Sequence, residues 1–544
     1  MMRANREIDA IALEVMRYAL SSVAEEMNAN LIRSAYSPNI KERRDCSSGI
    51  FDADGEMVAQ AESIPVHLGA MPYSVAAAVA ACPKMEPGDV VVLNDPYAGG
   101  AHLPDVTFVS PVFAQGARVA FVANRAHHAD VGGKEPGSLA GDTREIYQEG
   151  MRIPPVRLWK QWVPDEELMR LILLNVRTPE ERRGDLQAQH AACAIGIERM
   201  TELFREHGGS RLTAGMRAMS DYSERRMRAA IEALPDGSAS FEDVLDGDGV
   251  TEGSIPVRVE IRIAGDEIAV DFTGSSPQVV GPVNAVEAVT ASAAFYAIRA
   301  LTDPGIPANA GCYRPIRIKA PGGTIVNCRP PAPVVGGNLE TSQRMVDVIL
   351  GAFGRLVPDH AIAACQGTMN NVAIGGIDPR TGLAYSLYET IGGGTGARLD
   401  ADGIDGIHSH MTNTLNTPIE ALELAYPLRV ERYELRAGSA GAGRHRGGLG
   451  IRRDIRCVDH EARASLLTDR RSSRPYGVAG GKPGERGKNL LIRDREEIEL
   501  PAKGTTSMQP GDVISIRTPG GGGYGDPQAR AMEGIERDTR EDRL

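Results

Sequence analysis

The stretch that most constrains this chain runs from Val91 to Gly133, where two short apolar runs are each followed by a polar loop. The runs Val91 to Leu93 and Val119 to Ala123 predict two buried strands. Gly99 and Gly100 lie in the first loop, and Gly132 and Gly133 lie in the second. Glycine allows positive φ angles and close backbone approach. The pattern therefore predicts two neighbouring strand ends with tightly folded loops.

The same two loops carry side chains that bind metals. The first holds Asp95, His102 and Asp105, and the second holds His127, His128 and Asp130. Zinc, manganese and iron(II) all accept imidazole and carboxylate ligands together. The residues therefore favour a divalent metal site (Mn, Zn or Fe). The alternative is a set of polar loop residues in which a neighbouring carboxylate satisfies each histidine.

Composition limits the class of protein. A chain of 544 residues predicts two or three domains. A net charge of −12 argues against a nucleic-acid surface, which would be basic. The sequence contains no run of about 18 apolar residues, so no membrane span is expected. Its start lacks the apolar core of a signal peptide. The 7 cysteines are scattered singly, so the chain is expected in a reducing cytoplasm.

Periodicity predicts an α+β, mixed multi-domain fold. An N-terminal α/β metal-binding region (1–210) is followed by a central helix and hairpin region (211–365), a β-rich, glycine-rich C-terminal region (366–528) and a tail (529–544). Helical spacing marks residues Ile8 to Tyr36, Asp165 to Arg228, Val286 to Leu301 and Glu340 to Leu356. Hairpins are expected around Asp54-Gly55 and across Ile255 to Phe272.

Five further motifs carry a family resemblance together with NDPYAGGAHLPDV and NRAHHADVGG. They are SAYSPNIKERRDCSSGIFDADGEMVAQ from Ser34, GGNLETSQRMVD from Gly336, GGGTGAR from Gly392, HSHMTNTLNTPIEALE from His408 and TPGGGGYGDP from Thr518. In this order they resemble the hydantoinase B/oxoprolinase family, which includes the B-type components of ATP-dependent hydantoinases and lactamases. The family is similar to the alpha subunit of acetone carboxylase.

The resemblance implies a metal site and its ligands. An aspartate of the N-terminal motif joins the metal in related proteins, and the match puts it at Asp45. The expected ligand set is Asp45, His102, Asp105 and His127, with His128 and Asp130 free to act as general base or to orient the ligands. His67, in a loop before a helix, is either structural or part of the pocket. No substrate-binding residue can be named.

The resemblance also implies a partner. In the family, a hydantoinase A-type subunit with an ATPase fold phosphorylates the carbonyl oxygen of a ring amide, and the B-type subunit completes hydrolysis. The chain has no strand–GxxxxGK[ST]–helix order for binding nucleotide phosphates. We therefore expect ATP to bind on a partner A-type ATPase subunit, in an α2β2-like assembly that hydrolyses a small cyclic amide.

Two other functions stay open at this stage. The chain could be an alpha-type subunit of an acetone-carboxylase-like ATP-dependent carboxylase. It could also be a non-catalytic partner subunit whose metal is structural. Loss of turnover without loss of assembly, after substitution of a ligand, would oppose the second alternative.

Overall fold

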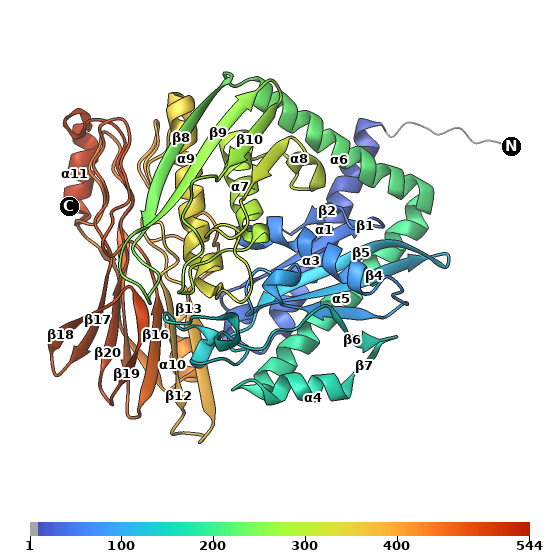
Figure 1. Cartoon of the computed structure of the whole chain (residues 1–544), viewed down its shortest axis with the longest axis horizontal. Helices are drawn as coiled ribbons and strands as arrows, with labels where there is room; N and C mark the ends of the chain where they lie inside the picture. The colour runs from blue at the N-terminus through green and yellow to red at the C-terminus, as the bar shows by residue number, and fades with distance from the viewer. Residues whose placement is uncertain (1–8, 62, 544) are drawn as a thin grey trace.

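The computed structural model describes residues 9–61 and 63–543, and Figure 1 shows their arrangement. A seven-stranded antiparallel sheet with the order β2-β1-β5-β4-β3-β6-β7 forms the N-terminal part, at the right of Figure 1. Its strands are β1 (Cys46–Asp52), β2 (Met57–Gln60), β3 (Val90–Leu93), β4 (Asp105–Ala114), β5 (Ala117–His127), β6 (Val156–Lys160) and β7 (Val163–Pro164). The hairpin at Asp54-Gly55 is thereby confirmed.

Helices cover both faces of this sheet because successive side chains of a strand point to opposite faces. Ile50 and Val122 pack in the hydrophobic cluster that contains α1 and α5. Phe51 and Phe121 pack in the cluster that contains α3. The helices of this region are α1 (Ala10–Ser34), α2 (Pro38–Lys41), α3 (Pro65–Ala81), α4 (Glu166–Leu174) and α5 (Pro179–His207).

The structure corrects one part of the predicted strand arrangement. The predicted strands β3 and β5 are not direct neighbours, because β4 lies between them and pairs with both. Asp105 is the first residue of β4 and His127 is the last residue of β5, so neither lies in a loop. Pro111 inside β4 weakens the sequence signal for a strand, because proline cannot donate to a sheet ladder.

The central part adds a four-stranded sheet and four helices, drawn in green and yellow in Figure 1. The sheet has the order β11-β10-β9-β8. The elements are α6 (Gly209–Glu232), β8 (Gly237–Leu245), β9 (Ile255–Ala264), β10 (Glu267–Asp271), α7 (Glu287–Leu301), α8 (Ala310–Tyr313), β11 (Ile316–Lys319) and α9 (Ser342–Leu356). The predicted hairpin is confirmed, and it turns at Gly265 with φ of 60°.

The C-terminal part is a sandwich of two sheets, at the left of Figure 1. One has the order β13-β12-β16-β19 and the other β14-β15-β20-β17-β18. The elements are β12 (Asn371–Ile377), β13 (Ala384–Glu389), α10 (Ile419–Ala425), β14 (Leu428–Arg436), β15 (Gly450–Cys457), β16 (Ala462–Leu467), β17 (Lys488–Arg493), β18 (Glu496–Leu500), β19 (Lys503–Met508), β20 (Val513–Arg517) and α11 (Met532–Arg540). Side chains of both sheets, such as Ile374 and Ile514, share one hydrophobic cluster. The mixed, multi-sheet α+β class is confirmed.

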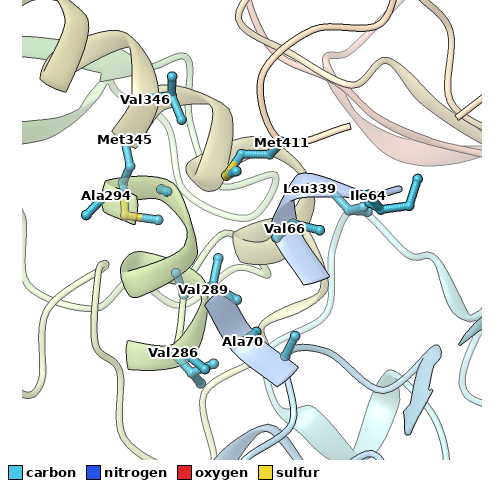
Figure 2. Close-up of a cluster of buried hydrophobic side chains, with 14 of the residues drawn as sticks. Ile64, Val66, Ala70, Val286, Val289, Ala294, Leu339, Met345, Val346 and Met411 are labelled. Atoms are coloured by element: carbon cyan, nitrogen blue, oxygen red, sulfur yellow. The ribbon is translucent and has the colours of Figure 1, made fainter. Parts of the chain in front are cut away.

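One hydrophobic core joins the N-terminal and central parts. It contains Met16 of α1, Val289 of α7 and Met345 of α9. Figure 2 shows α3, α7 and α9 meeting in this core, with Val66, Val289 and Met345 among the labelled side chains. The predicted domain boundaries after residues 210, 365 and 528 stay predictions. No helix formed by residues 9–61 and 63–543 is long and apolar enough to cross a membrane.

Candidate metal centre

The candidate site begins with a pair of residues that strand register brings together. Asp105 and His127 are direct partners in the antiparallel pair β4–β5. The Cβ atoms of such partners lie about 4.5–5.5 Å apart on one face of the sheet. Accordingly, Nδ1 of His127 lies 3.3 Å from Oδ1 of Asp105, and both side chains are buried.

A tight loop brings His102 close to Asp105. Gly99 has a φ of 90°, a conformation that glycine adopts without strain. A Cβ atom on Gly100 would lie 2.5 Å from the carbonyl oxygen of Asn94. The Asn94 amide donates to the carbonyl of Leu103 at 2.8 Å and closes the loop. Nε2 of His102 is thereby held 3.1 Å from Oδ1 of Asp105.

The three side chains offer ligand atoms that converge on one point. Their ligand atoms lie within 4.8 Å of one another. Both nitrogens of His102, Nε2 of His127 and both carboxylate oxygens of Asp105 are buried without a hydrogen-bond partner. Buried polar atoms in proteins are nearly always paired, so this cluster has the donor set of a metal site.

Electrostatics support the ionised form of the carboxylate. Burial raises the pKa of Asp105, but the imidazoles of His102 and His67 outweigh burial and hold that pKa well below its ordinary value. Burial lowers the pKa of His127 and keeps its imidazole neutral. A metal binds an ionised carboxylate and a neutral imidazole, and these are the states of Asp105 and His127. The residues present thus fit a divalent ion of the zinc, manganese or iron(II) type.

His67 joins this cluster from the first turn of α3. Its Nε2 lies 3.4 Å from Oδ2 of Asp105, and its Nδ1 lies 3.1 Å from Oγ of Ser47. The Ser47 hydroxyl also accepts a bond from the backbone N–H of Ile64, which fixes it in place. Of the two interpretations open for His67, the structure favours the pocket, where it orients Asp105.

Replacing His67 with alanine is expected to weaken metal binding by about 10–100-fold, the usual effect of removing a group that orients a ligand. The protein should still bind one equivalent of metal when metal is in excess. Competition against a chelator of known affinity measures this change. Complete loss of metal at every concentration would instead make His67 a ligand.

Asp45 borders the same site but stands outside the three closest ligands. Its backbone carbonyl accepts from the N–H of His127 at 3.0 Å, which puts the residue beside the cluster. Asp45, His67, Asp105 and His127 line one small cavity of about 20 Å³. The other lining residues are Ile64, Val66, Asn338, Leu339, Met369, Tyr388, Thr390, Met411, Thr412 and Thr414. The role of Asp45 as a fourth ligand stays a prediction.

The structure does not bring Asp95, His128 or Asp130 into this cluster. Asp95 caps the turn at Tyr97 and pairs with Arg152 at 2.8 Å. His128 contacts Gln189 at 2.9 Å through its Nε2, and burial lowers the pKa of its imidazole to about 4.

Asp130 holds its own loop together. It accepts from the backbone N–H groups of Gly132, Gly137 and Arg177 and pairs with the Arg177 guanidinium at 3.0 Å. The proposed roles of His128 and Asp130 in proton transfer stay predictions, and these contacts favour a positioning role for both.

Residues 9–527 match the family model described as hydantoinase B/oxoprolinase. The chain belongs to this family. It is 42% identical over 541 residues to an uncharacterized protein of Methanocaldococcus jannaschii, in a match that covers 99% of this chain and 94% of that protein. It is 39% identical to 5-oxoprolinase 1 of Arabidopsis thaliana over 95% of this chain, but spans only 42% of that longer protein. A protein of a Pseudomonas species, named as the B component of a D-/L-hydantoinase, is 33% identical over 97% of this chain and 92% of its own.

Two solved structures share the fold across the chain. The ATP-dependent caprolactamase from Pseudomonas jessenii has a TM-score of 0.91 at 31% identity, covering 99% of this chain and 95% of that one. Acetone carboxylase has a TM-score of 0.90 at 19% identity, covering 99% of this chain and 78% of that one. At that identity the second likeness concerns the fold alone.

The sequence motifs do not identify one further residue of the site, an aromatic side chain that packs on His127. The ring of Tyr388, in β13, stacks on His127 with ring centroids 4.5 Å apart. Its hydroxyl donates to Asn371 at 2.9 Å, and the Arg43 guanidinium lies 4.9 Å from its ring. Burial raises the pKa of Tyr388 well above its ordinary value, so it stays a neutral phenol. No local sequence pattern links residues 127 and 388. Arg43 lies within the motif SAYSPNIKERRD, which indicates the family but not this contact.

Proposed function

We propose that this chain is the metal-containing B-type subunit of an ATP-dependent cyclic amidase, acting on a hydantoin, 5-oxoproline or a lactam. The observation that carries the proposal is the buried cluster of His102, Asp105 and His127, whose ligand atoms are unpaired. The family relationship and the likeness to an ATP-dependent caprolactamase support the same reaction class.

His102, Asp105 and His127 would hold the metal, with Asp45 as the expected fourth ligand. A divalent ion supplies Lewis acidity that polarises a carbonyl oxygen. His67 orients the Asp105 carboxylate. Tyr388 fixes the plane of the His127 ring by stacking. Apolar walls at Ile64, Val66, Leu339 and Met411 keep bulk water from the cluster, which strengthens electrostatic interactions inside it.

The partner in this proposal is an A-type ATPase subunit, in an α2β2-like assembly. The name of the Pseudomonas relative, which makes it one component of a hydantoinase, supports a second subunit. The Arabidopsis 5-oxoprolinase supports it as well, since more than half of that chain lies outside the match. We propose that the missing ATPase function is supplied in trans.

The isolated chain, loaded with metal, is expected not to open an unactivated ring amide. Five- and six-membered ring amides close readily, because the amine and carboxyl are held at effective molarities of up to about 10⁵–10⁸ M. A metal lowers a barrier but does not shift that equilibrium, so ATP must drive the reaction. Ring opening and phosphate release should appear together only when the A-type subunit and ATP are added.

Three parallel reactions test whether ring opening needs the partner subunit. They contain the chain alone, the chain with its partner, and the partner alone, each with a panel of ring amides. Rapid ring opening by the chain alone would refute the two-subunit reaction. Addition of acetone and bicarbonate to the complete mixture tests the carboxylase alternative, since ATP use and carbon fixation would then depend on those two compounds.

A further inference from the structure

Two motifs of the sequence meet beside the metal ligands. Arg43 belongs to the motif SAYSPNIKERRD, and Thr412 and Thr414 belong to the motif HSHMTNT. The N–H of Leu415 donates to the carbonyl of Arg43 at 3.0 Å, and Nε of Arg43 donates to the carbonyl of Leu415 at 3.2 Å. This reciprocal pair of bonds holds the two segments together.

Three threonine hydroxyls form a chain that starts at Arg43. Nη2 of Arg43 donates to Oγ1 of Thr390, the residue after β13, at 2.6 Å. Oγ1 of Thr390 lies 2.7 Å from Oγ1 of Thr414, which lies 3.4 Å from Oγ1 of Thr412. All three threonines are buried and line the cavity of about 20 Å³ beside the metal ligands, here called the metal cavity. The hydroxyl chain therefore runs along the wall of the metal cavity.

The guanidinium of Arg43 sets the direction of this chain. A guanidinium only donates hydrogen bonds, whereas each hydroxyl has one hydrogen to donate. Thr390 accepts from Arg43, so its own hydrogen goes to Thr414, and the hydrogen of Thr414 goes to Thr412. In the opposite order, the Thr390 hydrogen would have no acceptor among the described residues, and an unpaired buried donor is unfavourable. The last hydrogen of the chain is thus on Thr412.

Thr412 has no protein acceptor for this hydrogen. Its hydroxyl contacts only Thr414 among the side chains and backbone groups of the described residues. Thr412 also borders two cavities, the metal cavity and a larger one of about 460 Å³. The acceptor for the Thr412 hydrogen must therefore come from a bound group.

The size of the metal cavity limits that group. A water-sized group needs about 10–15 Å³, so the metal cavity takes roughly one oxygen atom and not a whole organic molecule. Figure 2 shows four apolar residues that line this cavity: Ile64, Val66, Leu339 and Met411. An oxygen that enters between them is removed from bulk water, where a hydrogen bond from Thr412 is electrostatically stronger.

Arg43 adds a positive charge to the chain. Its side chain is fully buried. Its hydrogen bonds go to neutral oxygens, namely the Asn39 amide, the carbonyls of Tyr388 and Leu415 and the hydroxyls of Thr390 and Thr414. Buried charges in proteins usually have a partner of opposite charge. A donor fixed in place and polarised by this cation favours an oxygen that carries negative charge.

We propose that the Thr412 hydroxyl donates a hydrogen bond to the substrate oxygen that gains negative charge in the metal cavity. Thr412 is then a catalytic residue, and Arg43, Thr390 and Thr414 are positioning residues that act through it. This role deepens the proposed function and rests on it, since the oxygen is the carbonyl oxygen of the amide that is hydrolysed.

Fluoride binding to the manganese-loaded full chain tests the donor without a substrate or a partner subunit. Fluoride is a single anionic atom that accepts hydrogen bonds and cannot donate them, so it stands in for the charged oxygen. Exchange with paramagnetic manganese broadens the fluorine NMR signal, and a titration gives the affinity. Thr412→Val keeps the branched shape and removes the hydroxyl. It should weaken fluoride binding by about 10-fold or more, the effect of losing one hydrogen bond to a charged group.

Two further variants show whether the hydroxyl itself is responsible. Thr412→Ser keeps the donor and should recover most of the affinity. Thr505→Val removes a hydroxyl that contacts Ser465 at 3.0 Å in the C-terminal sandwich, and it should leave fluoride binding unchanged. Unchanged or stronger binding in Thr412→Val, or no fluoride binding by the natural sequence, overturns the proposal.

A double variant tests the chain that leads to Arg43. Thr414→Val leaves the Thr412 hydroxyl in place but removes its link to the guanidinium, so it should weaken fluoride binding less than Thr412→Val. Adding Thr414→Val to Thr412→Val should cause no further loss, because residues of one hydrogen-bond network are not additive. Additive losses would mean that the two hydroxyls act independently, and they would overturn the chain.

Metal content and turnover separate this proposal from the proposed function. Normal metal content with equal fluoride affinity in Thr412→Val overturns the donor and leaves the proposed function standing. Selective loss of fluoride binding, without ATP-dependent ring opening by the natural chain and its A-type subunit, refutes the proposed function and leaves the donor in place. Where both hold, Thr412→Val should lower kcat by about 10²-fold or more with little change in KM, since one donor to a developing charge is lost. A natural chain that binds no metal refutes both.

Discussion

Replacing His127 with alanine is expected to remove bound metal and ring-opening activity together. His127 supplies one of three converging ligands and lies directly opposite Asp105 in the sheet. Lewis-acid stabilisation by a metal contributes several kcal/mol to a transition state, and each 1.36 kcal/mol is a factor of ten in rate. Activity should therefore fall by at least about 10³-fold. Elemental analysis of the purified variant and a rate assay with the A-type subunit measure the two losses.

His128→Ala is the matched control for this experiment. The two histidines are adjacent and equally buried, but the imidazole of His128 contacts Gln189 and not the cluster. This variant should keep its metal. If His128 or Asp130 is the general base, His128→Ala or Asp130→Asn should slow turnover by roughly 10²–10⁴-fold, and normal turnover would exclude that role. Full metal content in His127→Ala would disprove the proposed ligand set.

The centre of the site could be predicted because its residues are local in sequence. His102 and Asp105 are three residues apart, and His127 ends the β4–β5 hairpin that Asp105 begins, so the open end of that hairpin brings all three together. The order of the strands was not predictable to the same degree, since Pro111 obscured β4. The local pattern predicts the ligand residues, but it does not predict the strand register that pairs Asp105 with His127.

The surroundings of the site could not be predicted because they depend on tertiary contacts. His67 reaches Asp105 only through the packing of α3 against the sheet. Tyr388 comes from the C-terminal sandwich, more than 250 positions from His127 in sequence. A cavity of about 460 Å³ likewise gathers side chains from Pro65 to Asn413. Hydrophobic periodicity predicts elements and their faces, but it does not specify which distant faces meet.

A buried network of charges joins the central region to the C-terminal sandwich. The Arg344 guanidinium, in α9, binds Asp243 of β8 at 2.9 Å, Asp347 at 3.0 Å and Asp469 at 3.0 Å. Asp469 follows β16 and also binds Lys503, the first residue of β19, at 2.7 Å. Arg344 is fully buried, so its charge is stabilised by these carboxylates and not by water.

Replacing Arg344 with methionine is expected to destabilise the protein by about 3–5 kcal/mol, because removing one member of a buried charge network leaves its carboxylates undercompensated. Among the described arginines and lysines, Asp243 and Asp347 keep only Arg470, and Asp469 keeps only Lys503. The side chains of arginine and methionine are similar in length, so the loss reflects charge more than volume. The shift of the urea unfolding transition measures it, with Arg317→Met as the control. Arg317 pairs with Glu267 at 3.2 Å, but its side chain is 64% exposed, and an exposed pair contributes only about 0–1 kcal/mol. Equal shifts in the two variants would show that the buried network does not hold the two regions together. A larger shift in Arg344→Met would show that the buried network stabilises the contact between the two regions.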